Sequence, residues 1–450
     1  MTQRPQTLDA WLEYIERLHH RPVDLGLERV RAVAQRMGMA WPRRSFVVGG
    51  TNGKGSTCAM LDAILRAAGY RVGIYASPHL LHFRERARVD GATPADAELI
   101  EQFALVEDAR VDTTLTYFEF TTLAILAWFA RREVDVAVLE IGLGGRLDAV
   151  NIVDADCAIV TSVDLDHMEL LGATRAQIGW EKAHIFRPGR PAICGDPDPP
   201  ATLVEHARET GADLWRIGAD FHVEAPASDP YTGAGGARQW SYRGRHEHRL
   251  ALPVPALRGA HQLRNAATAL AALEATSGLL PVDQQAVRSG LAGVQLPGRF
   301  QVVPGRPVIV LDVAHNPHAA TALAQALRAH ADLERAAGGA PGATRAVFGM
   351  LRDKDASAVA EALRAELDFW YLVPTYGERG QDARALAQRV FETQSQPTAT
   401  AMQMQWRTFD SVAAALETAQ GDAAPNDRIV VLGSFVIVAQ ALRWLERRSR

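Results

Sequence analysis

The chain has 450 residues, of which 48% are hydrophobic and 22% charged, and its formal net charge is −4 at pH 7. A chain of this length exceeds one ordinary hydrophobic core, so at least two domains are expected. The slightly acidic balance, without a long basic run, argues against nucleic acid as the main partner.

Secretory and membrane signals are not found in the sequence. Residues 1–20 lack the continuous apolar run of a secretory signal, and no segment reaches the ~20 apolar residues that span a bilayer. Cys58, Cys157 and Cys194 are odd in number and far apart, which favours buried thiols over disulfides or a zinc site. We therefore expect a cytoplasmic protein with no membrane partner.

The first part of the chain alternates short β-branched runs with longer helical patterns, which is typical of a parallel α/β sheet. Crossover helices are expected at 58–69 and 120–132, between buried strands. The expected strands are 45–48, 71–76, 134–141, 157–162 and 191–194.

The pattern changes after residue 220. Residues 221–255 are rich in turn formers and predict small β-strands around a loop at 228–238, and a helix is expected at 259–278. Pro297 and Gly298 then mark a domain boundary. Beyond it the βα pattern restarts, with strands expected at 307–315, 345–351, 368–374 and 427–434 and a Gly/Ala/Pro-rich loop at 335–345.

The stretch SFVVGGTNGKGSTC, residues 45–58, leads from an apolar strand through glycines into a helical pattern. Gly50, Gly53 and Gly55 let backbone N–H groups turn inward around an anion, next to a helix N-terminus. Lys54 adds a mobile charge for the outer phosphates. Gly55, however, stands where the usual phosphate-loop formula has the magnesium-binding Ser or Thr. A glycine turn with a solvated lysine is the alternative interpretation.

Three other strands of the expected sheet end in polar residues at the edge where such sheets bind ligands. Ser77 follows the second strand, Glu140 lies at the end of the third, and His167 follows the fourth. Magnesium prefers hard oxygen ligands and accepts a nitrogen in a mixed site. Structural alternatives are a helix N-cap for Ser77, an ion pair with Arg146 for Glu140, and a loop role for His167.

A set of motifs occurs in order along the chain: GTNGKGST, SPHLLHFRERARV, LTYFEFTTLA, LEIGLGGRLDAVN, LDHMELLG, EKAHIFRPG, HQLRNAATAL, LPGRFQ, LDVAHNPHAA, FGMLRDKD and VLGSF. Together they resemble the bacterial folylpolyglutamate synthase/dihydrofolate synthase family, a branch of the Mur ligase superfamily. The resemblance extends from about Asp24 to Ser434.

The resemblance implies an α/β fold, with a P-loop-containing parallel-sheet ATP-binding domain at 1–296 and a smaller Rossmann-like C-terminal domain at 297–450. It implies an ATP-dependent ligase that phosphorylates a substrate carboxylate, after which the amine of L-glutamate attacks the acyl phosphate. The implied acceptors are dihydropteroate and the γ-carboxylate of reduced folates. Asp24, within PVDLGLERV, resembles the members that use dihydropteroate. The family suggests a monomer.

The resemblance also implies roles for single residues. It gives Ser77, Glu140 and His167 as the magnesium ligands; two metal sites are expected, and a monovalent cation is allowed. Lys182 matches a lysine carried as a carbamate, which forms only from the free amine and so implies a lowered pKa; an ion pair with Glu181 is the alternative. The implied ATP contacts are Gly50, Thr51, Asn52, Gly53, Lys54, Gly55, Ser56, Asn265, Arg299 and Asp312. Catalytic roles are expected for Lys54 and Lys182, with His315 and Asp312 as candidate general bases.

The implied pterin site draws on three segments: Asp24, Leu25 and Gly26 in DLGL; Thr116, Tyr117, Phe118 and Glu119; and Leu147, Asp148 and Ala149. A flat ring needs an apolar slot with a few polar groups, and one of the two aromatic residues is expected in the core. The sequence departs from the family at His184, where glycine is common, and at Val436, where a polar or aromatic residue is common.

Other functions remain open. A folylpolyglutamate synthase without dihydropteroate activity is one alternative, and a Mur-type ligase acting on a cell-wall precursor is another. Against the second, only 44 residues precede the phosphate loop, which leaves no room for a domain that binds a nucleotide-linked sugar. A non-catalytic ATP- or folate-binding protein would have no use for metal ligands at the γ-phosphate.

Overall fold

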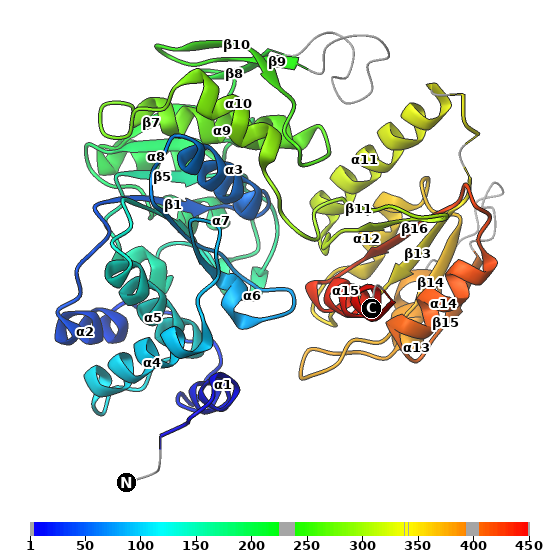
Figure 1. The fold of residues 1–450 in the computed structure, drawn as a ribbon, viewed down its shortest axis with the longest axis horizontal. Helices are drawn as coiled ribbons and strands as arrows, with labels where there is room; N and C mark the ends of the chain where they lie inside the picture. Colours follow the sequence, from blue (N-terminus) through cyan, green and yellow to red (C-terminus); the bar gives the residue numbers. More distant parts are fainter. Residues whose placement is uncertain (1–3, 225–238, 337, 341, 393–404, 449–450) are drawn as a thin grey trace. The chain divides into compact units, whose positions relative to one another are not determined.

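The protein is described here by a computed structural model that covers residues 4–224, 239–336, 338–340, 342–392 and 405–448. The chain divides into two compact units (Figure 1). Unit 1 contains Met1–Glu224, Trp240–Pro253 and Arg264–Val294, and unit 2 contains 254–263 and 295–450. Within the described ranges, no helix combines the length and the apolarity needed to cross a membrane.

Unit 1 is built on a seven-stranded sheet of order β3-β2-β4-β1-β5-β6-β7. All neighbouring strands pair in parallel except β2 and β3. The inner strands are buried, as a parallel sheet covered by helices requires. The strands are β1 (Arg44–Gly49), β2 (Val72–Tyr75), β3 (Ala87–Val89), β4 (Val136–Glu140), β5 (Cys157–Val160), β6 (Pro191–Cys194) and β7 (Asp213–Arg216).

The five strands predicted in this unit are all present. The prediction missed β3 and β7, which form the two edges of the sheet. Strand β3 has only three residues, too few to show a period, and β7 is a partly exposed DLWR segment without an apolar run. Edge strands are short and half solvated, so the hydrophobic signal that revealed the inner strands is weak in them.

Helices cover both faces of this sheet. Figure 1 shows α1, α2, α4 and α5 grouped together, with α3, α9 and α10 elsewhere in the unit. The expected crossover helices are confirmed as α3 and α5, each starting a few residues early, and the expected helix at 259–278 is α9. The helices are α1 (Leu8–Glu16), α2 (Glu28–Met37), α3 (Lys54–Ala67), α4 (Asp96–Arg110), α5 (Tyr117–Arg131), α6 (Met168–Leu171), α7 (Arg175–Ala183), α8 (Ala201–Thr210), α9 (His261–Ala275) and α10 (Gln284–Gly293), with short helices η1 (Phe83–Arg86) and η2 (Ala149–Ile152).

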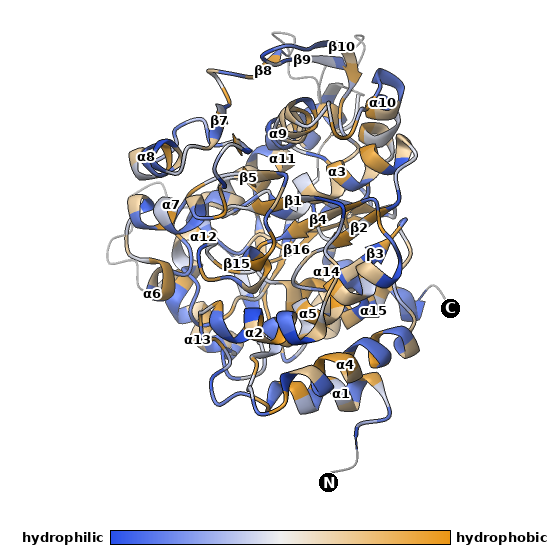
Figure 2. Ribbon diagram, turned by 90° about the vertical axis from the view of Figure 1, so that its left-hand side faces the viewer, coloured by the Kyte–Doolittle hydropathy of each residue, from blue (hydrophilic) through white to orange (hydrophobic). Residues whose placement is uncertain are grey.

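The distribution of apolar residues explains this layering. Figure 2 shows strands β2 and β4 as hydrophobic, whereas α2 carries many hydrophilic residues. One core cluster joins one face of the sheet to α1, α2, α4 and α5. Its largest buried side chains include Trp11, Phe103, Phe120 and Phe129. The N-terminal segment is therefore part of the unit 1 core.

A separate three-stranded sheet of order β10-β9-β8 follows the main sheet in sequence. Its strands are β8 (His222–Glu224), β9 (Gln239–Arg243) and β10 (His248–Pro253). This confirms the small strands expected within 221–255. The loop predicted at 228–238 lies outside the described residues.

Unit 2 contains a six-stranded sheet of order β11-β12-β16-β13-β14-β15, parallel except for β11 with β12. The four predicted strands are present, and the two edge strands were again missed; β15 is exposed along its whole length. Residues 337 and 341 of the predicted Gly/Ala/Pro loop lie outside the described residues. The elements are β11 (Gln301–Val303), β12 (Val308–Leu311), α11 (Pro317–Ala336), β13 (Thr344–Phe348), α12 (Ala356–Leu363), β14 (Phe369–Leu372), α13 (Ala383–Ala387), η3 (Gln388–Glu392), β15 (Gln405–Thr408), α14 (Val412–Asp422), β16 (Arg428–Leu432) and α15 (Phe435–Arg448).

The predicted fold class is confirmed: each unit is an α/β layer structure on a mostly parallel sheet. Unit 1 contains the phosphate loop between β1 and α3.

Candidate active site

The glycine-rich loop joins β1 to α3, as its sequence predicts. Gly50 and Gly53 have φ values of 141° and 90°. A Cβ atom on Gly50 would lie 2.0 Å from Thr161 Oγ1, and one on Gly53 would lie 2.6 Å from Asn265 Oδ1. Only glycine fits these two positions. The same contact places Asn265, an expected ATP ligand, directly beside the loop.

Lys54 is the first residue of α3 and folds back over the loop. Its Nζ donates to the carbonyl oxygens of Gly50 at 2.9 Å and Thr51 at 3.1 Å. Ser56 is buried within the first turn of the same helix. The loop therefore combines a helix N-terminus, a left-handed turn and a cation, which is the chemistry of a phosphate site.

The order of the strands explains how the expected metal ligands approach this loop. β1 lies between β4 and β5, and β2 lies on the other side of β4. Glu140 stands in register with Val48, just before the loop, and its Oε2 accepts a hydrogen bond from the backbone N–H of Ser77 at 3.2 Å. A buried carboxylate and a hydroxyl-bearing residue thus meet beside the phosphate loop, which are donors that suit Mg²⁺.

The structure argues against two of the structural alternatives, an N-cap for Ser77 and an ion pair between Glu140 and Arg146, and leaves the loop role of His167 open. The chain does not form a helix directly after Ser77, so Ser77 is no N-cap. Arg146 binds Glu181, with distances of 3.1 and 3.0 Å to Oε1. His167 precedes α6 in the left-handed region with φ of 51°, next to Asp166. In the described part of the chain no three His, Cys, Asp or Glu side chains could hold a metal by themselves, so a metal here would need the Ser77 hydroxyl and phosphate or water oxygens.

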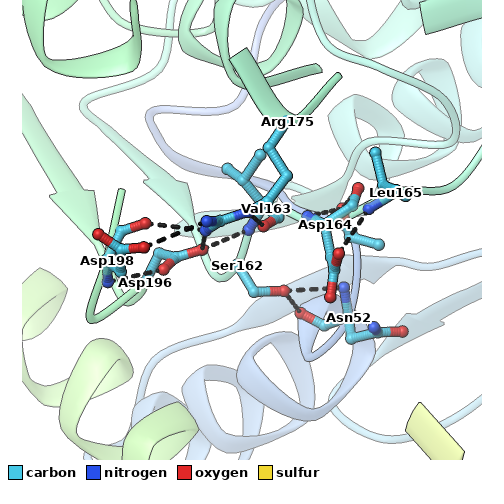
Figure 3. Close-up of polar contacts among 9 residues, drawn as sticks. Asn52, Ser162, Val163, Asp164, Leu165, Arg175, Asp196 and Asp198 are labelled. Atoms are coloured by element: carbon cyan, nitrogen blue, oxygen red, sulfur yellow. Dashed lines mark hydrogen bonds and ion pairs between the residues drawn. The ribbon is translucent and has the colours of Figure 1, made fainter. Parts of the chain in front are cut away.

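The loop after β5, which leads to His167, is tied to the phosphate loop (Figure 3). Ser162 Oγ accepts from the backbone N–H of Asn52 and donates to the carbonyl oxygen of Asn52, both at 3.0 Å. Thr51 Oγ1 likewise donates to Asp164 O at 3.0 Å and accepts from Asp164 N at 2.9 Å. These reciprocal bonds hold the two loops at a fixed distance.

The other side of that loop is held by charged residues, also drawn in Figure 3. Asp196 Oδ2 accepts from the backbone N–H of Val163 at 2.7 Å. Arg175 Nε donates to Val163 O at 2.9 Å, and its guanidinium binds Asp198 at 3.2 Å. Ser162, Arg175, Asp196 and Asp198 were not selected from the sequence. The only available signal was the hydroxyl pair Thr161-Ser162 at the end of a buried strand.

Lys182 lies on α7 and is 4% exposed. Burial lowers the pKa of its amine to about 7, and the nearby Lys54 charge acts in the same direction. This direction agrees with the lowered pKa expected of the lysine, while the carbamate itself stays a prediction. The alternative ion pair is less favourable, because the Glu181 carboxylate already binds Arg146.

The three segments of the expected pterin site converge on one hydrophobic cluster. Leu27 and Ala149 are buried in it, and Leu147 packs against it. The ring of Phe118 stacks on Tyr75, with centroids 6.0 Å apart and planes at 23°. Its edge lies against Gly142, where a Cβ would be 2.6 Å from Phe118 Cζ.

Tyr117 packs against a different ring, with its centroid 6.2 Å from that of Phe83. The Arg86 guanidinium lies 5.3 Å from the Tyr117 ring centroid, and burial raises the pKa of the phenol to about 12. Tyr117 and Phe118 are both only partly buried, so the expectation that one of them belongs to the core is wrong. The buried core aromatics of this helix are Phe120, Trp128 and Phe129.

The three carboxylates of these segments have different environments. Asp148 is buried and accepts backbone N–H bonds from Leu143 at 2.8 Å and Val150 at 2.9 Å; burial raises its pKa to about 6. Glu119 forms a capping box with Thr116 at the start of α5. Asp24 precedes Leu25 and Gly26, and its side chain remains 26% exposed.

The expected residues of unit 2 gather at the end of β12. The Asp312 carboxylate accepts from Phe300 N and Ala314 N, both at 2.8 Å, and burial raises its pKa. The Arg299 guanidinium lies 5.3 Å from the Phe435 ring centroid. His315 lies 6.2 Å from the same ring, and its Nδ1 is 2.9 Å from Val313 O. Phe435, at the start of α15, was not selected from the sequence as a site residue.

The two residues at which the sequence departs from the family, His184 and Val436, lie in different environments. The His184 Nδ1 is 2.7 Å from Trp180 O, and its ring stacks on His206 at 3.9 Å between centroids. Val436 is exposed in the first turn of α15.

Comparison with known proteins identifies the family. Residues 48–273 match the Mur ligase middle domain, and residues 298–435 match the Mur ligase glutamate ligase domain. The dihydrofolate synthase/folylpolyglutamate synthase of Escherichia coli strain K12 is 43% identical over 447 residues, which cover 99% of this chain and 97% of that protein. The chain belongs to the dihydrofolate synthase/folylpolyglutamate synthase family.

Solved structures of this family have the same fold. The structure of E. coli FolC in complex with DHPP and ADP has a TM-score of 0.89 and 42% identity and covers 100% of both chains. A bifunctional folylpolyglutamate synthase/dihydrofolate synthase with Mn, AMPPNP and L-glutamate bound has a TM-score of 0.84 and 43% identity, and covers 99% of this chain and 100% of that one. The resemblance drawn from the motifs is confirmed, and the chain is an ATP-dependent ligase.

Proposed function

We propose that this chain joins L-glutamate to dihydropteroate, and to the γ-carboxylate of reduced folates, with ATP as the phosphoryl donor. The observation that carries the proposal is the meeting of a phosphate loop, a buried carboxylate and a buried lysine of lowered pKa in unit 1. The same unit carries the partly buried ring of Phe118, stacked on the buried Tyr75, in an apolar setting that suits a flat pteridine ring. The relatives named above bind nucleotide, DHPP and L-glutamate.

The ATP phosphates would lie on the loop from Gly50 to Ser56, with Lys54 turning from the loop carbonyls to the outer phosphates. Asn265 adds an amide at the same place. In unit 2, Arg299 and Asp312 are the further proposed ATP contacts.

Magnesium would be held by Ser77, Glu140 and His167, and we keep the second metal site and a monovalent cation as part of the proposal. The bound ion supplies positive charge to the phosphate oxygens at which negative charge develops. The Ser77 hydroxyl and the Glu140 carboxylate fit this role as hard oxygen donors, and the backbone N–H of Ser77 donates to Glu140 Oε2.

The acyl-phosphate step uses groups of this chain for charge stabilisation. A substrate carboxylate attacks the γ-phosphorus, the bond to the β,γ-bridging oxygen breaks, and ADP leaves. Lys54 and the loop N–H groups stabilise the charge on the transferred phosphoryl group, usually the largest catalytic contribution. The neutral amine of Lys182 would attack CO₂ and lose a proton to form a carbamate. The carbamate would present oxygen acceptors where the lysine otherwise carries a positive charge.

The second step joins glutamate to the activated carbonyl, and phosphate leaves. The amine must first lose a proton. Both Asp312 oxygens accept backbone N–H bonds, whereas the bond from His315 Nδ1 to Val313 O leaves the lone pair of the neutral ring on Nε2. His315 and Asp312 are the two candidate proton acceptors. Arg352 and the buried Lys354, in the loop after β13, supply positive charge at the same edge of the unit 2 sheet for the carboxylates of glutamate.

We also propose that the protein works in the cytoplasm as a monomer. Cys58, Cys157 and Cys194 are buried free thiols, which suits a reducing compartment.

Phosphate release tests this function. Purified protein is given Mg-ATP and L-glutamate with either dihydropteroate or tetrahydrofolate. Turnover with both acceptors is expected. Turnover with tetrahydrofolate alone would show that dihydropteroate is not a substrate. Absence of turnover with both acceptors, by protein that is folded and binds ATP, would overturn the proposal.

A further inference from the structure

A network of side chains joins two segments of the proposed pterin site, and its inner members have no role so far. His19 lies in the turn after α1 and is buried. Its Nδ1 is 2.8 Å from Thr114 Oγ1, and its Nε2 is 3.1 Å from Asp24 Oδ2. The imidazole therefore bridges the segment that leads into α5 and the segment that leads into α2.

Arg29, in the first turn of α2, makes a second bridge between the same segments. Its NH1 donates to Asp24 Oδ2 at 2.7 Å and its NH2 to Asp24 O at 2.6 Å. The same NH2 donates to Glu119 Oε1 at 3.1 Å, and Nε donates to Glu119 Oε2 at 3.4 Å. One guanidinium thus holds two carboxylates at a set distance.

The two carboxylates differ in what remains available to a ligand. Glu119 is buried, and both of its oxygens are used, since Oε2 also accepts from Thr116 N at 2.8 Å. Among the described residues, every contact of the Asp24 carboxylate is made by Oδ2, and the side chain is 26% exposed. Oδ1 is thereby the oxygen that can accept from a substrate.

The charge on Asp24 is stabilised by the same network. Desolvation alone would raise the pKa of this carboxyl, but the Arg29 charge and the His19 hydrogen bond lower it. Asp24 therefore stays an anionic acceptor, and a charged acceptor makes a stronger hydrogen bond than a neutral one.

We propose that His19 and Arg29 are positioning residues for the acceptor substrate: by binding Asp24 Oδ2 they direct Oδ1 toward an N–H donor of the pteridine ring. They also hold the segment from Asp24 to Leu27 against the segment from Thr116 to Glu119, between which the ring lies. This inference rests on the proposed function, because the ring is that of the pteroate or folate acceptor.

Steady-state kinetics of R29Q, R29K, H19A and H19Q test the proposal, with the KM for dihydropteroate, the KM for Mg-ATP, kcat and the melting temperature measured for each. R29Q is expected to raise the KM for dihydropteroate about tenfold, as loss of an ionic hydrogen bond predicts, with the KM for Mg-ATP and kcat within about twofold. R29K keeps the charge beside Asp24, so its KM should lie between those of R29Q and the wild type. H19Q retains a donor for Asp24 and should rescue much of the H19A defect.

The chain offers matched controls. Arg31 is exposed on the same helix as Arg29, and His20 is exposed with its ring 4.4 Å from His19. R31Q and H20Q should keep the wild-type KM for dihydropteroate. A purely structural role for the network would lower the melting temperature and raise both KM values together, and that result would overturn the proposal.

Failure of the inference and failure of the proposed function give different results. If the wild type turns over and R29Q and H19A keep its KM for the acceptor, the positioning role is wrong while the ligase activity stands. If the wild type turns over tetrahydrofolate alone, the same KM comparison is made with tetrahydrofolate. If it turns over neither acceptor, both proposals are overturned.

Discussion

The phosphate loop and the proposed pterin region are adjacent parts of unit 1, but they are built in opposite ways. The phosphate loop is shaped by the backbone: glycines that admit no Cβ, and reciprocal bonds between backbone groups and the hydroxyls of Thr51 and Ser162. The pterin region is shaped by side chains: the ion pairs of Arg29 and the ring of Phe118 stacked on Tyr75.

This difference determines how each region should respond to substitution. A backbone-built site leaves no space for added atoms, so a single methyl group displaces several donors at once. In a site built from side chains, each substitution removes one contact. The loss of affinity should therefore be small for each substitution and should appear in the KM for one substrate.

The largest effect is expected for Gly53→Ala. The added Cβ would meet Asn265 Oδ1 at 2.6 Å, at a φ of 90° that alanine disfavours. Displacement of the loop should lower kcat/KM for Mg-ATP about a thousandfold, because several charge-stabilising donors move together. Phosphate-release kinetics would measure the loss.

Gly69→Ala is the matched control for that variant. Gly69 also has positive φ, 91°, but a Cβ there would have no neighbour within 4 Å. It should cost only stability, on the order of 1 kcal/mol, and leave kinetics unchanged. Equal kinetic losses in both variants would contradict crowding against Asn265 as the cause of the Gly53→Ala loss.

Lys182→Ala should lower kcat about a hundredfold, a typical loss when an outer ligand of a metal site is removed. A carbamate is a carboxylate equivalent, so added formate or acetate should restore part of the activity. Glu181→Gln should stay near wild type, because Glu181 pairs with Arg146. No rescue by any small carboxylate would contradict the carbamate.

The pH dependence of reactivation by CO₂ sharpens the same prediction. With the pKa of Lys182 lowered to about 7, half of the amines are neutral at that pH. At fixed dissolved CO₂, the rate at which CO₂-depleted enzyme regains activity should rise from pH 6 to 8 and then level off. An ordinary lysine, with a pKa of ~10.5, would give a rate that still rises at pH 9.

Phe118→Ala should raise the KM for dihydropteroate about tenfold and leave the KM for Mg-ATP unchanged, as expected for loss of one aromatic contact. Phe118→Leu, which keeps apolar volume without a ring, should give a smaller rise. Equal changes in both KM values would place this ring in the fold rather than in the acceptor site.

Asp148→Asn should give the smallest kinetic effect but a clear pH signature in stability. The pKa of Asp148 is raised to about 6, so its stabilising protonated form is complete below pH ~4 and is lost as pH rises through 6. The free energy of unfolding of the wild type relative to D148N should fall by up to about 2–3 kcal/mol over that range. Urea denaturation from pH 4 to 7 measures it, and a flat difference would contradict the raised pKa.

Much of this fold could be predicted from hydrophobic runs. The inner strands of both sheets are continuous apolar segments, because burial on both faces demands them. The edge strands β3, β7, β11 and β15 were missed, because a half-solvated strand does not need an apolar run. The phosphate loop and the polar strand ends near it could also be predicted, since the spacing of glycines and the parallel direction of strands are local properties.

The sequence by itself determined the family, the fold class and the residues of the phosphate loop, because each depends on short ordered motifs. Only the tertiary structure decided which side chains hold the site together. The network of His19, Asp24, Arg29 and Glu119 joins residues up to 100 positions apart, and the lowered pKa of Lys182 depends on burial and on the charge of Lys54. Contacts between distant segments and the desolvation of a charge arise only when the chain is folded, so no local sequence pattern predicts them.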